Sequence, residues 1–153
     1  MIGFRAGTTF TFDFWSNSIN YNYTTEDNRW HHWACVYNTN INGTNRWLYR
    51  DGVLVGSDNA GDYMGSGNLW LGGDNAFGTF FFGGKLNDVR IYDKARTQAE
   101  IQGDMNSQIT GGEANLTMYL PINNEDCLVD YSANHYPIAV SYTHLTLPTI
   151  CSV

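Results

Sequence analysis

Residues 46–57 read RWLYRDGVLVGS, and this stretch decides the fold expected of the chain. Asp51 and Gly52 stand between two apolar segments, and both positions tolerate the positive φ angles that a two-residue hairpin turn requires. The segment therefore predicts two antiparallel strands joined by a tight turn, with Asp51 as a turn residue.

Two upstream segments show the period-two alternation that is typical of strands. In residues 8–15, TTFTFDFW, the phenylalanines fall on alternate positions, so one face of the strand is aromatic. Residues 30–37, WHHWACVY, predict a second strand. Because successive side chains of a strand point to opposite faces, its residues divide into two sets. These sets are His32, Ala34 and Val36 on one face, and His31, Trp33, Cys35 and Tyr37 on the other.

One short helix is expected, near residues 95–102. Thr97 and Glu100 have the spacing of a capping box, in which each side chain accepts a hydrogen bond from the backbone amide of the other residue. Many strands and one late helix predict an all-β fold, an antiparallel two-sheet jelly-roll sandwich. The remaining strands are expected at residues 68–71, at residues 84–93 and around Tyr21 and Tyr23.

Composition and charge narrow the class of protein. Of the 153 residues, 42% are hydrophobic and 15% are aromatic, which is enough apolar material for the core of about one domain. The net charge of -7 argues against nucleic-acid binding, which needs clustered Lys and Arg. No apolar run approaches the roughly 18 residues of a membrane span, so we expect no membrane insertion.

The adjacent histidines His31 and His32 suggest a metal site or a catalytic pair. Neighbours in a strand point to opposite faces, so both rings cannot reach one ion. The sequence also contains no G-x-S-x-G motif that would supply a nucleophile. We therefore interpret the pair as structural, with His32 packing inward through a hydrogen bond. Cys35, in the same strand, is expected to be a buried, inert thiol, and the odd number of cysteines leaves disulfide pairing open.

Three motifs together resemble laminin-G-like domains of the concanavalin A-like jelly-roll fold. Residues 30–34, WHHWA, are similar to the family's W-H-H-V-A strand, and residues 48–52, LYRDG, to its L-Y-V-D-G hairpin. Residues 84–92, GKLNDVRIY, followed by AEI at 99–101, resemble its closing signature. The match corresponds to the later part of such a domain.

The resemblance also suggests how the chain is divided. Residues 116–121, LTMYLP, and 130–134, DYSAN, resemble the opening of another copy of the domain. Residues 140–149, VSYTHLTLPT, resemble the translation of a sequencing adapter. We therefore interpret four segments: the C-terminal part of a laminin-G-like jelly roll at 1–102, a linker at 103–112, the start of a second similar repeat at 113–140, and an adapter-derived tail at 141–153.

One strand pairing follows from this division. The opening and closing strands of the fold lie together, so we expect residues 116–120 to pair with residues 89–92.

For function, the resemblance implies a non-catalytic extracellular or cell-surface module that recognises a glycan or an extracellular protein through rim loops, beside neighbouring tandem repeats. Tyr63, Phe77 and Phe80 are the candidates for stacking on a sugar ring. Asp74 and Asn75 occupy the loop where the related pentraxin jelly rolls carry acidic metal ligands. They suggest a calcium site completed by other oxygens, and the alternative is an ordinary turn.

Two other functions remain open. A structural spacer repeat would bind no ligand. A module of a concanavalin A-like glycoside hydrolase would carry an E-x-D-x-E strand, whose alternate carboxylates project into one cleft. The glutamates of this chain do not form that pattern, so we expect no catalysis in this part of the protein.

Overall fold

The chain forms two compact units, and each is made of two separate segments. Unit 1 comprises residues 1–83 and 95–107, and unit 2 comprises residues 84–94 and 108–153. The linker and repeat boundaries expected from the sequence stay predictions, and the expected tail at 141–153 lies outside the described residues. The computed structural model describes residues 1–5, 8–14, 17–22, 28–63, 65, 67–73, 82–122 and 129–139.

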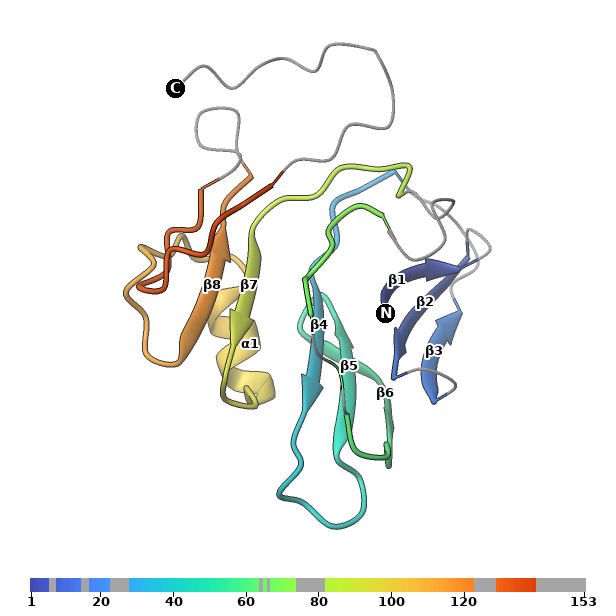
Figure 1. The fold of residues 1–153 in the computed structure, drawn as a ribbon. Coiled ribbons are helices and arrows are strands. Elements are labelled where there is room, and N and C mark those ends of the chain that lie inside the picture. Colours follow the sequence, from blue (N-terminus) through green and yellow to red (C-terminus); the bar gives the residue numbers. More distant parts are fainter. Residues whose placement is uncertain are drawn as a thin grey trace. The chain divides into compact units, whose positions relative to one another are not determined.

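Unit 1 contains two antiparallel three-stranded sheets and a helix, as expected for a concanavalin A-like sandwich (Figure 1). The first sheet has the order β1 (Ile2–Arg5), β2 (Thr9–Asp13), β3 (Ser18–Asn22). The second sheet has the order β4 (Trp33–Tyr37), β5 (Arg46–Arg50), β6 (Val53–Asp58). Asp51 and Gly52 have φ angles of 52° and 75°, which confirms the predicted tight turn between β5 and β6.

The aromatic face of β2 forms the core between these two sheets. Phe10 and Phe12 are buried with Ile19 of β3 and Leu48 of β5. The ring of Phe10 stacks on that of Trp33 with 3.8 Å between the centroids. Each such side chain contributes about 1.5–3 kcal/mol when it is fully buried, so the alternation read from the sequence accounts for this core.

Strand β4 is covered on both faces, in the two sets that its alternation predicts. Trp33, Cys35 and Tyr37 pack against the core between the sheets. Ala34 and Val36 pack on the other face, in a cluster that includes Ile101 of the helix.

The helix α1 (Gln98–Asp104) confirms the predicted capping box. The Thr97 hydroxyl accepts from the Glu100 amide, and the Glu100 carboxylate accepts from the Thr97 amide. The helix begins at Gln98 rather than near residue 95, because Thr97 is the cap. Two of its glutamines, Gln98 and Gln102, donate side-chain hydrogen bonds to the carbonyl of Gly52, which joins the helix to the β5–β6 turn.

In unit 1, the structure differs from the sequence prediction at three places that concern strands. β4 begins at Trp33 rather than at residue 30, because its partner β5 ends at Arg50 and the chain turns at Asp51. Residues 68–71 form no strand, and Leu69, Trp70 and Leu71 are exposed there. A short run of apolar residues indicates that a segment is able to form a strand, but a strand forms only where a neighbouring strand is available for backbone hydrogen bonds. The sequence did not predict β1, which pairs with β2.

Unit 2 is built on the expected pairing of two strands distant in sequence. β7 (Val89–Tyr92) lies antiparallel to β8 (Leu116–Leu120), with Val89 opposite Leu120 and Ile91 opposite Met118. The strand expected at 84–93 is therefore shorter than predicted. A small core of Ile109, Leu116 and Tyr119, with Tyr92 packed against it, lies beside the ladder.

The Cys35 side chain is half-buried and packs against the core between the two sheets. Burial raises the pKa of Cys35 from 9.0 to about 12. We expect iodoacetamide at pH 8 to leave Cys35 unmodified in the folded protein and to modify it in urea, as measured by peptide mass spectrometry. Between pH 9 and about 12 the thiol ionises in the unfolded chain but not in the folded one, so the free energy of unfolding falls as the pH rises through this window. Rapid native labelling of Cys35 would contradict the prediction.

Candidate binding rim

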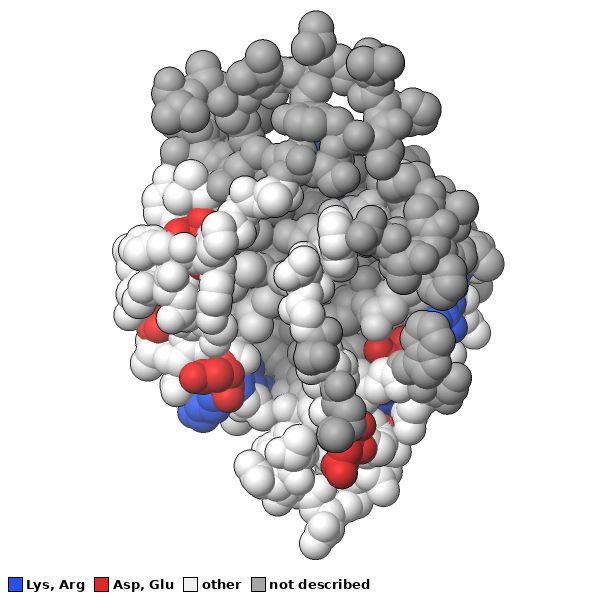
Figure 2. Space-filling view, in the orientation of Figure 1, with Lys and Arg blue, Asp and Glu red and all other residues white. Residues whose placement is uncertain are grey.

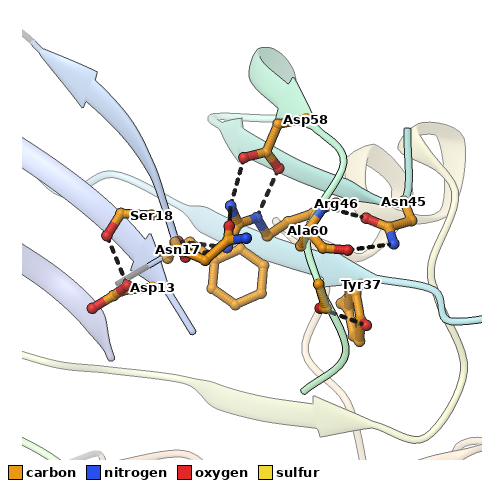
Figure 3. Close-up of polar contacts among 10 residues, drawn as sticks. Asp13, Asn17, Ser18, Tyr37, Asn45, Arg46, Asp58 and Ala60 are labelled. Atoms are coloured by element: carbon orange, nitrogen blue, oxygen red, sulfur yellow. Dashed lines mark hydrogen bonds and ion pairs between the residues drawn. The ribbon is translucent and has the colours of Figure 1, made fainter. Parts of the chain in front are cut away.

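A buried arginine organises the end of unit 1 from which the rim loops leave the sheets (Figure 3). The side chain of Arg46, at the start of β5, is 0% exposed. Its Nε and one Nη nitrogen donate to the two carboxylate oxygens of Asp58 at 2.8 and 2.5 Å. Its other N–H groups donate to the carbonyls of Phe12 and Asn17 and to the Asn17 side chain. All N–H donors of the guanidinium are therefore used within the protein. Arg46 thus stabilises this end of unit 1 and has no donor left for a ligand.

The loop that follows β6 is fastened to the loop that precedes β5. Asn45, which is buried, donates through Nδ2 to the Ala60 carbonyl at 3.0 Å and accepts from the Ala60 amide at 2.7 Å (Figure 3). The Tyr37 hydroxyl, at the end of β4, donates to the Gly61 carbonyl at 3.0 Å. These bonds fix the direction of the chain as it approaches residue 63.

Tyr63 presents an exposed aromatic ring at this rim. It is 58% exposed, and its ring lies against Phe14 with 5.1 Å between the centroids. Phe14 in turn packs edge-on against Tyr37 at 4.7 Å, and the Arg46 guanidinium lies over Phe14 at 4.9 Å. We call Phe14, Tyr37 and Tyr63 the Tyr63 rim. A methyl group at Gly65 would overlap the Tyr63 hydroxyl, so this glycine leaves the space that the ring occupies.

The other residues predicted for binding lie in a segment that the structure does not describe. Phe77, Phe80, Asp74 and Asn75 all fall within 74–81, outside the described residues, so their roles stay predictions. Within the described ranges, no group of three or more His, Cys, Asp or Glu residues is placed to hold a metal ion. Calcium binding therefore also stays a prediction.

The two histidines lie at the opposite end of the β4–β5 ladder, beside the Asp51 turn. Nδ1 of His31 lies 2.7 Å from Asp51 Oδ2, and its Nε2 lies 2.8 Å from Nη2 of Arg50. Since a guanidinium only donates, Nε2 accepts and Nδ1 carries the proton that is donated to Asp51. The His32 amide donates to the other Asp51 oxygen at 2.9 Å. Both ring nitrogens of His31 thus have protein partners, which supports a structural role. This contact of His31 was not read from the sequence.

Comparison with known proteins identifies the family. A laminin G family model, described as the concanavalin A-like lectin/glucanases superfamily, matches residues 1–102. The chain belongs to this family. No curated protein and no solved structure matched the chain. Laminin G domains bind carbohydrate or protein ligands and are typically non-catalytic, although the superfamily also includes glycosidases.

Two further features concern membrane-spanning helices and surface charge. Within the described ranges, no helix is long and apolar enough to cross a membrane. On the face in Figure 2, the Lys and Arg side chains of the described residues lie in small separate groups.

Proposed function

We propose that this laminin G module is an extracellular or cell-surface binding domain that recognises carbohydrate through the Tyr63 rim. The supporting observation is the exposed Tyr63 ring, which is held against Phe14 on a fastened loop. The C–H face of a sugar packs on such a ring as apolar groups do. Asn59 and Asp62 are exposed in the same loop and have the side-chain oxygens and nitrogens that bind sugar hydroxyls.

The hydrogen bonds that order the loop before Tyr63 favour ligand binding at the Tyr63 rim. A ligand that orders a loose loop loses part of its interaction energy as conformational entropy, at about 0.5–1.5 kcal/mol per immobilised side chain. The bonds from Asn45 and Tyr37 order the chain up to Gly61 before any ligand arrives. Stacking on Tyr63 therefore carries a smaller entropic cost than stacking on a free loop.

Calcium at Asp74 and Asn75 forms a separate part of the proposal. These residues follow Gly72 and Gly73 in the same unit, and their oxygens are of the kind that Ca²⁺ prefers. If they bind calcium that supports the ligand site, a chelator will weaken glycan binding by the wild-type protein. If they form only a turn, the chelator will have no effect, and the stacking proposal stands or falls on Tyr63.

Replacing Tyr63 with alanine is expected to reduce glycan binding about tenfold, because an aromatic contact contributes about 0.5–1.5 kcal/mol beyond its buried area. A glycan array with and without EGTA would first identify the ligand, and calorimetry would then measure the Kd of wild-type and variant proteins. Trp30→Ala is the matched control. Trp30 is 64% exposed but lies near the Asp51 turn, at the opposite end of β4.

The outcomes of this experiment are distinct. Loss of binding in Tyr63→Ala with retention in Trp30→Ala, and unchanged circular dichroism in both, would support the proposal. Equal binding by wild type and Tyr63→Ala would place the ligand elsewhere. No binding by the wild-type protein on any glycan, with or without chelator, would contradict the proposal and favour a structural spacer repeat.

A further inference from the structure

The strand β7 is completed by a segment that lies outside the family match. The match ends at residue 102, whereas β8 comes after it, at residues 116–120. The ladder continues beyond both strands. The Asp88 amide donates to the Pro121 carbonyl at 3.1 Å, and the Asp93 amide donates to the Asn115 carbonyl at 3.0 Å. The segment after the module therefore supplies its closing strand with a full-length partner.

The segment that contains β8 has internal hydrogen bonds that do not involve β7. The carboxylate of Asp130, which is 2% exposed, accepts from the amides of Tyr119, Ser132 and Tyr136. The Ser132 hydroxyl donates to Asp130 and lies at hydrogen-bond distance from the Thr117 carbonyl of β8. Residues 129–136 are thus held on β8 by bonds that all lie within the segment. None of these hydrogen bonds has to break when β8 leaves β7.

The segment is also too apolar to remain unpaired. Leu116, Met118, Tyr119 and Leu120 are all buried. Exposing one such side chain costs about 1.5–3 kcal/mol, so the released segment would be unstable in water. A released β8 therefore needs an equivalent strand to pair with, and the β7 of another copy offers the same register of partners.

The connection between β7 and β8 allows the β8 that pairs with a given β7 to come from the same chain or from a second copy of the chain. After Lys94 the chain leaves unit 2 and runs through residues 95–107 of unit 1, and it re-enters unit 2 at Gln108. An exchanged pair of chains would form the same β7–β8 contacts, which is the condition for domain swapping. We propose that residues 108–139 are a strand-donor segment that occupies β7 of a second copy of this chain, producing an exchanged dimer at high concentration.

Cross-strand disulfides in the full chain test the proposal. Ile91 lies opposite Met118 in the ladder, so cysteines at these positions are close enough to bond. One copy carries Ile91→Cys, and a second copy with a different tag carries Met118→Cys, both with Cys35, Cys127 and Cys151 replaced by alanine. The two are unfolded, mixed, refolded at rising concentration and oxidised. Ile91→Cys mixed with Leu120→Cys is the matched control, because Leu120 is buried like Met118 but lies opposite Val89, two residues away from Ile91.

We expect a mixed disulfide between residues 91 and 118 of differently tagged chains, with a yield that rises with concentration and is at least about tenfold above the control. Light scattering of the unsubstituted protein, refolded over the same range of protein concentrations, should show a dimer fraction that increases with concentration. This measurement keeps the test valid if a cysteine variant fails to fold. A monomer at all concentrations, with no mixed disulfide, would overturn the proposal. A dimer whose mixed disulfide does not exceed the control would also overturn it, because the copies would then associate through another surface.

Discussion

Replacing Arg46 with alanine is expected to lower the free energy of unfolding by about 2–4 kcal/mol, because several hydrogen bonds from a buried charged group are lost together, at about 1.5–3 kcal/mol each, while the Asp58 carboxylate is 34% exposed and regains water. The substitution removes both hydrogen bonds to Asp58 and leaves the carbonyls of Phe12 and Asn17 without their donor. It also opens a space beside the Phe14 ring, over which the guanidinium lies. Urea unfolding followed by tryptophan fluorescence would measure the change.

Arg5→Ala is the matched control for this prediction. Arg5 donates to Asp13 at 2.9 Å, and its side chain is 49% exposed whereas that of Asp13 is 8% exposed. Asp13 keeps the hydrogen bond from the Ser18 hydroxyl when Arg5 is removed. A pair with one solvated partner contributes little, so we expect the control to lose about 1 kcal/mol. Arg46→Lys should lie between the two variants, because lysine keeps the charge but cannot reproduce the planar fork. If Arg46→Ala and Arg5→Ala were equally mild, the buried network would not hold the rim.

The second large effect is expected at Asp130. Asp130→Asn should destabilise unit 2 by about 2–4 kcal/mol, because hydrogen bonds to a charged group contribute about 1.5–3 kcal/mol and several are weakened together. One carboxylate oxygen becomes an NH2 group that faces the amide of Tyr136 and the Ser132 hydroxyl. Hydrogen exchange of the β8 amides would report the loss. Asp93→Asn, at an exposed aspartate of the same unit, is the control and should leave exchange unchanged.

The same carboxylate predicts a dependence on acid. Burial alone would raise the pKa of Asp130, but the backbone amides of Tyr119, Ser132 and Tyr136 and the Ser132 hydroxyl together lower it below the ordinary value of 3.8. A lowered pKa in the folded state means that the stabilisation is present above the unfolded value and is lost as the pH falls through the folded one. The protection of the β8 amides, measured as the exchange rate relative to the intrinsic rate at the same pH, should therefore fall below about pH 4 in the wild type, and this fall should be weaker in Asp130→Asn.

Local patterns were the most reliable part of the sequence-based prediction. The Asp51-Gly52 turn and the Thr97–Glu100 capping box are both confirmed, because each depends on residues no more than three positions apart. The β7–β8 pairing was predicted from a resemblance to opening and closing strands, and it is also confirmed. The strand expected at residues 68–71 was wrong, because alternation carries no information on whether a partner strand is present.

The candidate site depended much more on the tertiary structure. The sequence placed Tyr63 in a glycine-rich loop but gave no reason to set it beside Phe14, which lies 49 residues earlier in the numbering. The Arg46 network was not predicted at all, because its partners Phe12, Asn17 and Asp58 share no spacing with it. The contact of His31 with Asp51 escaped notice because the motif was read as a strand, whereas β4 begins at Trp33.

By itself, the sequence determined most of the strands, though not β1, and it determined where the β5–β6 hairpin turns and which family the module resembles. These properties follow from side-chain alternation and from φ preferences that act between near neighbours. Only the tertiary structure decided that all N–H donors of Arg46 are used within the protein, that Tyr63 stands exposed against Phe14 and that Asp130 accepts a hydrogen bond from Tyr119 of β8. Each of these depends on hydrogen-bond and ring geometry between residues far apart in the chain, which become neighbours only when the sheets assemble.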